Sequence, residues 1–293
     1  MPSPSGRRTA RRAGLDRRTR TDLPIRAEAA RIADSIRRTT IEQSKRAHVG
    51  HIGSSLSIAD ILGALFAGPL AGVRANNPDR HRLVLSKGHA ALALYGALHA
   101  TGRLTKAALD TYCADGSLLA GHPEHVQPGI DFSTGSLGQG LSLAAGAALA
   151  ARLQGSSRGA FAVLSDAELN EGSVWEAAMF ASHHHLANLV AVVDVNGQQA
   201  LGHTADVLDL EPLAEKWHSF RWDVHEVDGH DPEALTSALD SLDMSSGQPH
   251  ILLARTVSGK GVSFMESRIE WHYLPMCDSE YSSAVAELTR GPR

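Results

Sequence analysis

The chain has 293 residues, of which 43% are hydrophobic and 20% charged, an ordinary composition for a folded protein with one large core or two modest ones. No run approaches the roughly 20 apolar residues of a membrane-spanning helix, so no membrane role is expected. The formal net charge of −4 argues against nucleic acid as the main partner. Cys113 and Cys277 stand far apart in the sequence and outside any metal-binding spacing, which favours a reducing, cytoplasmic location.

The first part of the chain differs in composition from the rest. It reads MPSPSGRRTARRAGLDRRTRTD, with seven arginines by position 20 and almost no apolar residues. Such a segment cannot bury enough apolar surface to fold, so we predict a disordered basic tail over residues 1–24. A docking arm and an arginine-rich transit peptide are the alternatives that this composition allows. We expect residues 25–293 to form one domain.

After the tail, periodicity predicts an alternation of helices and strands. Apolar residues recur at helical spacing from about Pro24 to Ala47, and SIADILGALFAG predicts a helix that begins near Ser57. Helical stretches then alternate with short apolar runs, which are HRLVLS (81–86), GAFAVLS (159–165), NLVAVVDVN (188–196), RWDVHEVDG (221–229) and HILLARTVSG (250–259). This alternation predicts an α/β fold with a mostly parallel sheet and helices on both faces.

Two of the expected strands end next to an oxygen-bearing side chain. Asp166 follows FAVLS, and Asn196 follows LVAVVDV. Parallel sheets bind ligands at the carboxyl ends of their strands, so these side chains reach the same place if the two strands are neighbours. Two hard oxygen ligands suit Mg²⁺ or Ca²⁺, with phosphate oxygens and water in the remaining positions. In the alternative, Asp166 only caps the following helix, and Asn196 with Gly197 only forms a turn.

Several blocks of the sequence, in order, resemble transketolases. SDAELNEG and VDVNGQQ are similar to the diphosphate–metal motif of thiamine diphosphate enzymes. Further blocks restrict the resemblance from thiamine diphosphate enzymes in general to transketolases. They are VGHIGSSLSIADIL, RHRLVLSKGHAALALYGAL, LAGHPE, STGSLGQGLSLAAGAALA, EGSVWEAAM and TVSGKGVSFMESRIEWH. They cover about residues 26–285 and resemble in particular the amino-terminal subunit of split transketolases.

The resemblance implies a thiamine diphosphate-binding fold and a metal site. Asp166 and the side-chain oxygen of Asn196 would bind Mg²⁺, or Ca²⁺ or Mn²⁺, together with the carbonyl oxygen of Gln198. The residues that would contact the cofactor are Gly135, Ser136, Leu137, Asp166, Ala167, Glu168, Asn196 and His272.

The resemblance also implies catalytic residues. The histidines that would surround the reacting carbons are His51, His89, His122 and His272. Glu171 and Glu176 would lie at a subunit interface near the second active site. His51, His89 and His122 each stand beside a glycine in a predicted loop, where a ring can project toward a ligand. Side chains with a pKa near neutrality suit the proton movements of ketose chemistry, although a structural histidine remains the alternative at each position.

The implied activity is transfer of a two-carbon ketol unit from a ketose phosphate to an aldose or related acceptor. The family's activating glutamate belongs to a pyrimidine-binding domain that follows this one, so we expect a carboxy-terminal partner chain, in an assembly of two copies of each chain. The alternatives are the α subunit of a 2-oxoacid dehydrogenase-type or carrier-loading enzyme, and a cofactor-binding scaffold with impaired catalysis.

Three departures from the family pattern bear on the site. Ser165-Asp166-Ala167 stands where the family has Gly-Asp-Gly, and Tyr273 follows His272 where the family has glycine. A positive φ at Ala167 would cost about 1 kcal/mol or more, whereas a negative φ would make the change small. Such departures fit a relative with an altered substrate.

Overall fold

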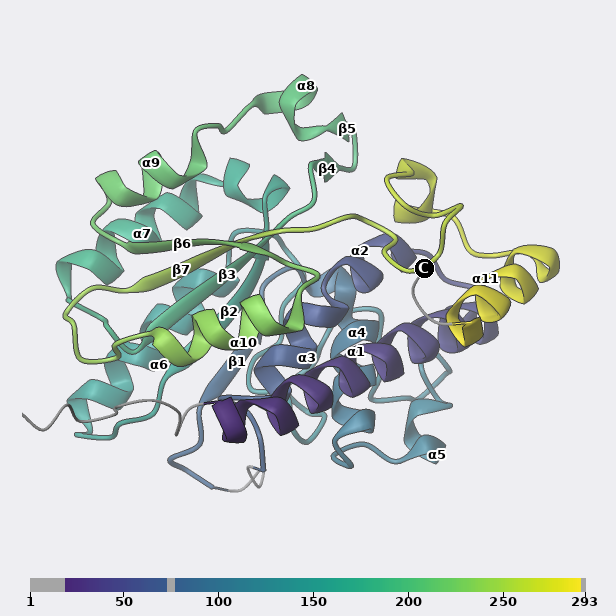
Figure 1. Cartoon of the computed structure of the whole chain (residues 1–293), viewed down its shortest axis with the longest axis horizontal. Helices are drawn as coiled ribbons and strands as arrows, with labels where there is room; N and C mark the ends of the chain where they lie inside the picture. Colours follow the sequence, from purple (N-terminus) through teal and green to yellow (C-terminus); the bar gives the residue numbers. More distant parts are fainter. Residues whose placement is uncertain (1–18, 73–76, 291–293) are drawn as a thin grey trace, which may run out of the picture.

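A five-stranded parallel sheet forms the centre of the molecule (Figure 1). The computed structural model describes residues 19–72 and 77–290. The strands are β1 (Arg82–Leu85), β2 (Ala160–Ser165), β3 (Leu189–Val195), β6 (Asp223–Asp228) and β7 (His250–Arg255). Their order is β1-β2-β3-β7-β6, and every neighbouring pair is parallel. The five predicted strand runs and the parallel sheet are therefore confirmed.

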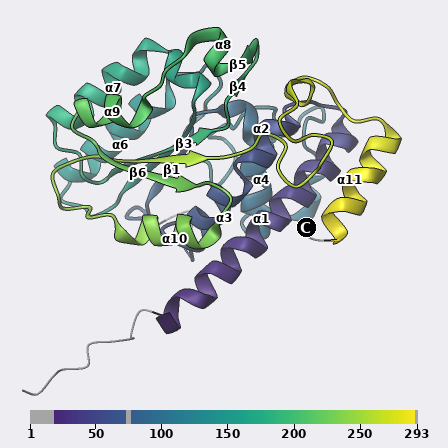
Figure 2. The same ribbon diagram turned by 45° about the horizontal axis from the view of Figure 1, so that its top comes forward.

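Helices cover both faces of this sheet, as predicted (Figures 1 and 2). One layer contains α1 (Thr19–Ala47), α3 (Ala59–Ala67), α4 (Ala91–Ala100) and α10 (Pro232–Ser241). The opposite layer contains α6 (Gly140–Leu153), α7 (Gly172–His183) and α9 (Leu213–Ser219). Side chains alternate along each strand, so Val163 packs in the first core and Leu164 in the second.

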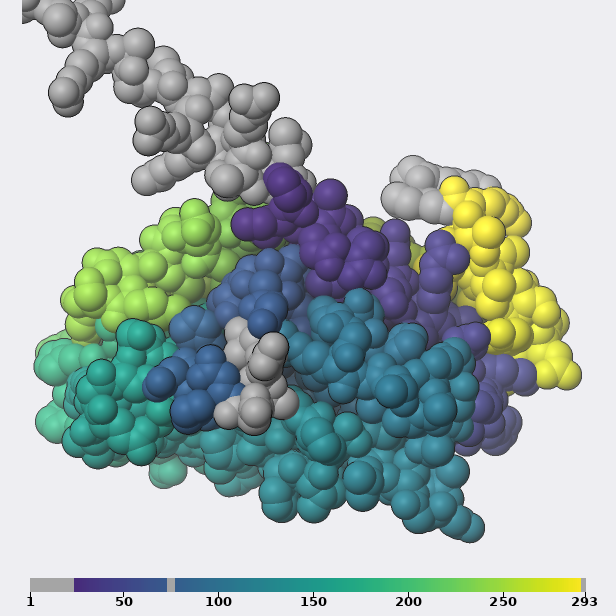
Figure 3. Space-filling view, turned by 90° about the horizontal axis from the view of Figure 1, so that it is seen from below, coloured from purple at the N-terminus to yellow at the C-terminus, as the bar shows by residue number. Residues whose placement is uncertain are grey.

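A smaller third core attaches the end of the chain to its beginning. Ile41 of α1 and Ile52 of α2 (Ile52–Ser57) pack there with Met265 and Trp271. Trp271 lies in η3 (Ile269–His272), and Ala284 of α11 (Asp278–Arg290) completes the cluster. Figure 1 shows α11 beside α1, and Figure 3 shows both on one outer face with α10. This packing brings η3 close to α2.

Short elements connect the main ones. They are η1 (Gly88–Ala90), α5 (Lys106–Leu109), η2 (Ala167–Asn170), β4 (Gln198–Gln199), β5 (Gly202–His203) and α8 (Thr204–Leu208). η1 follows β1, and η2 follows β2. β4 and β5 form an antiparallel hairpin after β3.

The predicted boundary of the basic tail is wrong at its inner end. Helix α1 begins at Thr19, so residues 19–24 belong to the helix and not to a disordered segment. Pro24 lies inside the helix, although proline lacks the N–H of the helical hydrogen bond and usually marks a helix boundary. The other residues of the predicted tail, 1–18, lie outside the described residues. Within the described ranges, no helix combines the length and the apolar character that crossing a membrane requires.

Candidate active site

The ends of β2 and β3 bring the two predicted metal ligands to one edge of the sheet. These strands are neighbours, with Ser165 in register with Asp194. The N–H of Asp166 donates to the carbonyl of Asp194 at 3.1 Å, so the two chains stay paired as they leave the sheet. Asp166 and Asn196 therefore lie at the same carboxyl edge, as the metal-site hypothesis requires.

Asp166 is a buried carboxylate with an incomplete set of partners. Its oxygens accept hydrogen bonds from the N–H of Ala167 at 2.9 Å and of Gly197 at 2.7 Å. Within residues 19–72 and 77–290, no cationic side chain is hydrogen bonded to it. Burial and the neighbouring Asp194 carboxylate raise the pKa of Asp166 to about 7. A divalent cation would supply the missing positive charge, so the residue fits a metal ligand as well as a cap.

The side chain of Asn196 is oriented by its neighbours. Its Nδ2 donates to Asp194 at 2.7 Å, and its Oδ1 accepts the N–H of Gln198 at 2.9 Å. Because a carboxylate only accepts and an N–H only donates, these bonds fix which end of the amide faces which partner. The Oδ1 keeps a second lone pair for a cation. Gln198, the third predicted ligand, lies two residues further on and begins β4.

A buried ion pair below this edge was not predicted from the sequence. Lys87 and Asp194 are both fully buried, and the Lys87 ammonium lies 2.5 Å from an Asp194 oxygen. Ser57 donates to the same carboxylate at 2.8 Å, and Thr256 donates to its other oxygen. Burial alone would raise the pKa of Asp194, but Lys87 and these hydroxyls hold it below its usual value. An aspartate inside the apolar run LVAVVDV was the signal that could have revealed it.

Three of the four predicted histidines form one cluster. The ring centres of His51 and His89 are 5.3 Å apart, and His272 lies 5.4 Å from each of them. The hydroxyl of Ser54 lies 3.1 Å from His89 Nε2 and 3.5 Å from His272 Nδ1. His51 is the N-cap residue of α2, His89 lies in η1 and His272 in η3, so the three histidines are distant in sequence. His89 follows β1 at the same carboxyl edge that carries Asp166 and Asn196.

The fourth histidine, His122, lies outside this ring cluster and is exposed. A Cβ added to Gly135 would meet its ring at 3.8 Å, so the two predicted site residues are neighbours. The buried Tyr95 hydroxyl donates to the carbonyls of Ala120 and His122 at 2.9 and 3.1 Å, respectively. These bonds hold the loop that carries His122.

Close backbone packing positions the histidine cluster. His51 adopts a left-handed conformation with φ of 58°, and its N–H donates to the carbonyl of His272 at 3.3 Å. A side chain on Gly50 would lie 2.3 Å from the carbonyl oxygen of Tyr273, so only glycine allows this approach. The Tyr273 hydroxyl bonds to the carbonyl of Ala200. Tyr273 thus ties η3 to the hairpin after Asn196, and His272 remains in the cluster despite this departure from the family sequence.

The clustered rings are neutral near pH 7. Burial lowers the pKa of His272 to about 4, with a further contribution from His51 and Lys87. Burial and the Lys87 charge bring the pKa of His89 well below 6.5, and burial also lowers that of His51. Neutral imidazoles can both donate and accept hydrogen bonds, which suits a site that binds the hydroxyl groups of a ligand.

The side chain of Glu168 faces the interior of this chain. It is fully buried, and its carboxylate accepts hydrogen bonds from the Ser86 hydroxyl and, at 2.8 Å, from the N–H of Gly138. It therefore holds the 135–138 loop from inside, and its contact with the cofactor stays a prediction. Gly138 has φ of 87°, a conformation that favours glycine. The other predicted residues of this loop are partly or fully accessible, namely Gly135, Ser136 and Leu137.

Glu171 and Glu176 are exposed on this chain. Glu171 is the N-cap residue of α7 rather than part of the helix, whereas Glu176 lies within it. Val174 and Ala178 are buried, so one side of α7 packs against the core. Burial of the two carboxylates themselves stays a prediction about the assembly.

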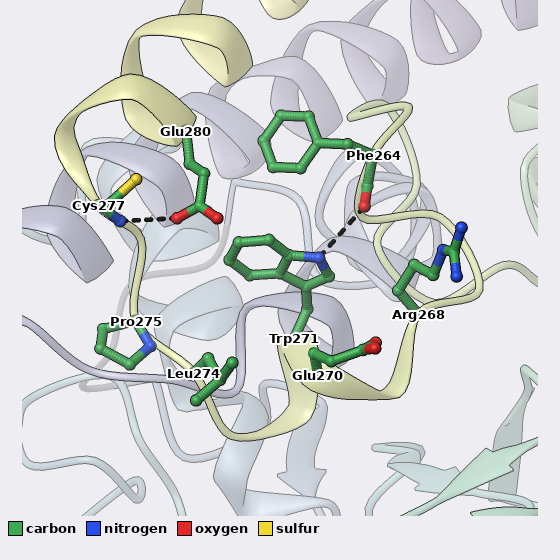
Figure 4. A pocket seen from close by; sticks show the side chains of 8 residues that line it. All are labelled: Phe264, Arg268, Glu270, Trp271, Leu274, Pro275, Cys277 and Glu280. Atoms are coloured by element: carbon green, nitrogen blue, oxygen red, sulfur yellow. Dashed lines mark hydrogen bonds between the residues drawn. The ribbon is translucent and has the colours of Figure 1, made fainter.

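A pocket lies beside η3 (Figure 4). Its described lining residues are Phe264, Arg268, Glu270, Trp271, Leu274, Pro275, Cys277 and Glu280, which include none of the clustered histidines. The Trp271 Nε1–H donates to the carbonyl of Phe264 at 3.2 Å. This bond holds Trp271 in place, and Trp271 directly precedes His272. The pocket wall therefore helps to position His272 in the histidine cluster.

A family model described as the thiamine diphosphate-binding domain of transketolase matches residues 28–291. The chain belongs to the transketolase family. Thiamine diphosphate binding and transketolase-type transferase chemistry are the properties of this family, and the prediction of a split enzyme agrees with the relatives described next.

Curated transketolase relatives include separate chains of similar length. The chain is 40% identical over 262 residues to a 6-deoxy-6-sulfo-D-fructose transketolase subunit of Clostridium sp. (strain MSTE9), covering 88% of this chain and 95% of the relative. It is 38% identical over 256 residues to an apulose-4-phosphate transketolase subunit of Phocaeicola vulgatus, covering 86% and 91%. Alignment over nearly the whole of both relatives favours the amino-terminal subunit of a split transketolase.

Solved transketolase structures share the fold. The Campylobacter jejuni transketolase superposes with a TM-score of 0.83 at 29% identity, covering 91% of this chain and 43% of that chain. The Pichia stipitis transketolase in complex with sedoheptulose 7-phosphate gives a TM-score of 0.83 at 27% identity, covering 90% and 41%. This chain therefore spans about two-fifths of the length of these solved transketolases.

Proposed function

We propose that this chain is the amino-terminal subunit of a two-chain transketolase that moves a two-carbon ketol unit from a ketose phosphate to an aldose or related acceptor. One observation carries the proposal. The cluster of His51, His89 and His272 lies at the same end of the sheet as Asp166 and Asn196. A hydroxyl-rich substrate held there would meet neutral imidazoles beside the site for a diphosphate.

We infer that Asp166, Asn196 and the carbonyl of Gln198 would hold Mg²⁺, which would supply positive charge for the diphosphate. The all-oxygen donor set and the uncompensated buried carboxylate of Asp166 support this metal. When bound, thiamine diphosphate supplies the nucleophilic carbon and the electron sink for cleavage of the carbon–carbon bond.

The chain's own contribution is to bind and orient the substrate. His89 and His272 share the Ser54 hydroxyl, which fixes the direction of both rings. Because the rings are neutral, each can accept a hydrogen bond from a sugar hydroxyl or donate one to a carbonyl oxygen. Lys87 keeps a positive charge below the cluster and disfavours its protonation.

The active enzyme would require a second chain with the pyrimidine-binding domain, in a heterotetramer. The apulose-4-phosphate transketolase relatives are each named as one subunit of their enzyme, which supports a partner chain. A reducing, cytoplasmic location is consistent with Cys113 and Cys277, both of which are free and exposed. No observation favours the 2-oxoacid dehydrogenase alternative or a catalytically impaired scaffold.

The test is reconstitution of the two chains with Mg²⁺ and thiamine diphosphate, assayed with ketose phosphates and separately with pyruvate. We expect ketol transfer from a ketose phosphate, and a loss of about 100-fold or more in turnover for His89→Ala with cofactor affinity changed less than about threefold. His218→Ala is the matched control because His218 is an exposed histidine in the last turn of α9. Turnover of pyruvate, or full sugar activity in His89→Ala, would contradict the proposal.

A further inference from the structure

A second group of ligand-type side chains lies at the opposite end of the sheet from the active site. Asp223 is the first residue of β6, and His250, the first residue of β7, is in register with it. His225 follows two residues later on β6. An Asp223 oxygen lies 2.8 Å from His250 Nδ1 and 2.9 Å from His225 Nε2. One carboxylate oxygen therefore faces two imidazole nitrogens at the amino edge of the sheet.

All three side chains lie on the α10 face of the sheet. Val227 and Leu252, at positions of the same parity as these residues, pack in the core beneath α10. The segment that follows α10 returns to the start of β7 at this edge, whereas β4 and α2 lie at the other end (Figure 1). In that segment, the Asp243 carbonyl oxygen lies 3.0 Å from His250 Nε2. The group is thus enclosed by β6, β7 and the chain that follows α10.

The hydrogen-bond pattern around His250 calls for a cation. A carbonyl can only accept, so the contact with Asp243 places a proton on Nε2 of His250. In the neutral ring, Nδ1 is then an acceptor, and it faces the Asp223 carboxylate, which also only accepts. Two acceptors at 2.8 Å repel unless a proton or a metal ion lies between them.

We propose that Asp223, His225 and His250 form a binding site for a Zn²⁺-type transition-metal ion, with water in a fourth position. Ligand atoms of tetrahedral zinc are separated by about 3.3 Å, given metal–ligand bonds of about 2.0 Å. The contacts here are a few tenths of an ångström shorter than that. The side chains of His225 and Asp223 are 29% and 40% exposed, so both can move outward and admit water.

The surroundings of His250 match those of a metal ligand. His250 is fully buried, and its other ring nitrogen is held by a backbone carbonyl. Metal-binding histidines commonly have such a partner, because it fixes the tautomer and directs the free lone pair at the metal. The Asp243 carbonyl is itself in an ordered turn, since the Asp243 carboxylate accepts the N–H and hydroxyl of Ser245 at 2.9 and 2.6 Å.

The donor set distinguishes this site from the proposed magnesium site. Two imidazole nitrogens with one carboxylate favour Zn²⁺, Co²⁺ or Ni²⁺, whereas Mg²⁺ selects oxygen donors. A metal here would join the edge strand β6 to β7 and to the segment after α10. The site lies at the amino edge of the sheet, at the opposite end from the site proposed for ketol transfer.

The experiment is a Co²⁺ titration of the metal-stripped full-length chain in excess Mg²⁺, which saturates the oxygen site. We expect the visible bands of tetrahedral cobalt, displaced by Zn²⁺, to saturate at one ion per chain. At a Zn²⁺ concentration about a hundredfold above Kd, the unfolding temperature should rise by roughly 5 to 10 °C.

Two partly exposed positions provide the variants, because His250 is buried and its replacement can impair folding. Asp223→Asn and His225→Ala should each weaken Co²⁺ binding by about 100-fold and remove the Zn²⁺-dependent rise in unfolding temperature. The matched control replaces His183 and His184 by alanine, which leaves the contact of His185 with Gly247 in place, and should bind as the wild type does. Absence of the bands, unchanged binding in both single variants, or loss of binding in the control would overturn the proposal.

Discussion

Ala167 stands where the family has glycine, and its backbone shows why alanine is tolerated there. It lies in η2, outside the residues with positive φ, so its methyl group causes no left-handed strain. Its N–H already donates to Asp166. The second departure, Ser165, is buried, and its hydroxyl accepts the N–H of Glu168 at 3.3 Å, so it supports the same turn.

Replacing Ala167 by glycine should therefore give no gain in function. We expect thiamine diphosphate affinity, measured by calorimetry with Mg²⁺ and the partner chain, to change less than about threefold. Stability in urea should fall by about 0.5–1 kcal/mol, because glycine loses more conformational freedom on folding. Binding more than tenfold tighter in Ala167→Gly would show that the methyl group obstructs the cofactor.

The neutral state of the histidine cluster has a consequence for pH dependence. The pKa of His272 is lowered to about 4 in the folded chain, so the unfolded chain binds this proton more readily. The contribution of His272 to stability is thus fully present above its unfolded pKa of about 6.5 and is lost as the pH falls toward 4.

We expect the ring resonances of His272 in the isolated chain to stay constant from pH 8 to about 5 and to titrate near pH 4. In His272→Asn, unfolding free energy should decline less steeply between pH 6.5 and 4 than in the wild type. A His272 titration midpoint above pH 6 would contradict the burial of this ring next to the Lys87 charge.

At the level of the elements, a buried ion pair links β1 to β3 across the strand β2 that separates them in the sheet. Lys87, just after β1, pairs with Asp194 near the end of β3, and Ser57 of α2 donates to the same carboxylate. Asn196 in turn donates to Asp194. The ion pair between Lys87 and Asp194 therefore helps to orient Asn196, a proposed metal ligand.

Lys87→Met should destabilise the chain by about 3–5 kcal/mol, because it leaves the Asp194 charge buried without its cation. Urea unfolding of the purified chain measures this. The matched variant is Lys87→Met with Asp194→Asn, which removes both charges and should recover a large part of the loss. If the single variant is as stable as the wild type, Lys87 does not neutralise Asp194.

Elements were predicted better than contacts. The strand runs and the location of Asp166 and Asn196 followed from alternating patterns and from the rule that ligands bind at the ends of parallel strands. The inward direction of Glu168 could not be predicted, because it depends on Ser86 and Gly138, which approach only in the folded chain. The start of α1 was also missed, since Pro24 is a boundary signal that this helix overrides.

At the scale of the whole molecule, α7 presents a face that this chain alone leaves uncovered. Glu176, Met179 and Phe180 lie at spacings of three and four residues, so they share one side of the helix. Met179 is 52% and Phe180 40% exposed, while Val174 and Ala178 face the core. Adjacent exposed apolar and acidic side chains are typical of a surface that another chain covers.

We expect this face of α7 to pack against the second copy in an assembly of two copies of this chain with two of its partner. Met179→Asp would place a charge in that contact, so sedimentation should detect one-to-one complexes and turnover should fall by about tenfold or more. Val285→Asp, at a comparably exposed apolar position on α11, is the control for Met179→Asp and should leave the heterotetramer intact.

Glu171→Gln should lower activity more than it lowers the unfolding temperature, because its carboxylate is exposed on the isolated chain. Robust ketol transfer by this chain alone, or a fully active one-to-one complex, would refute the need for this assembly.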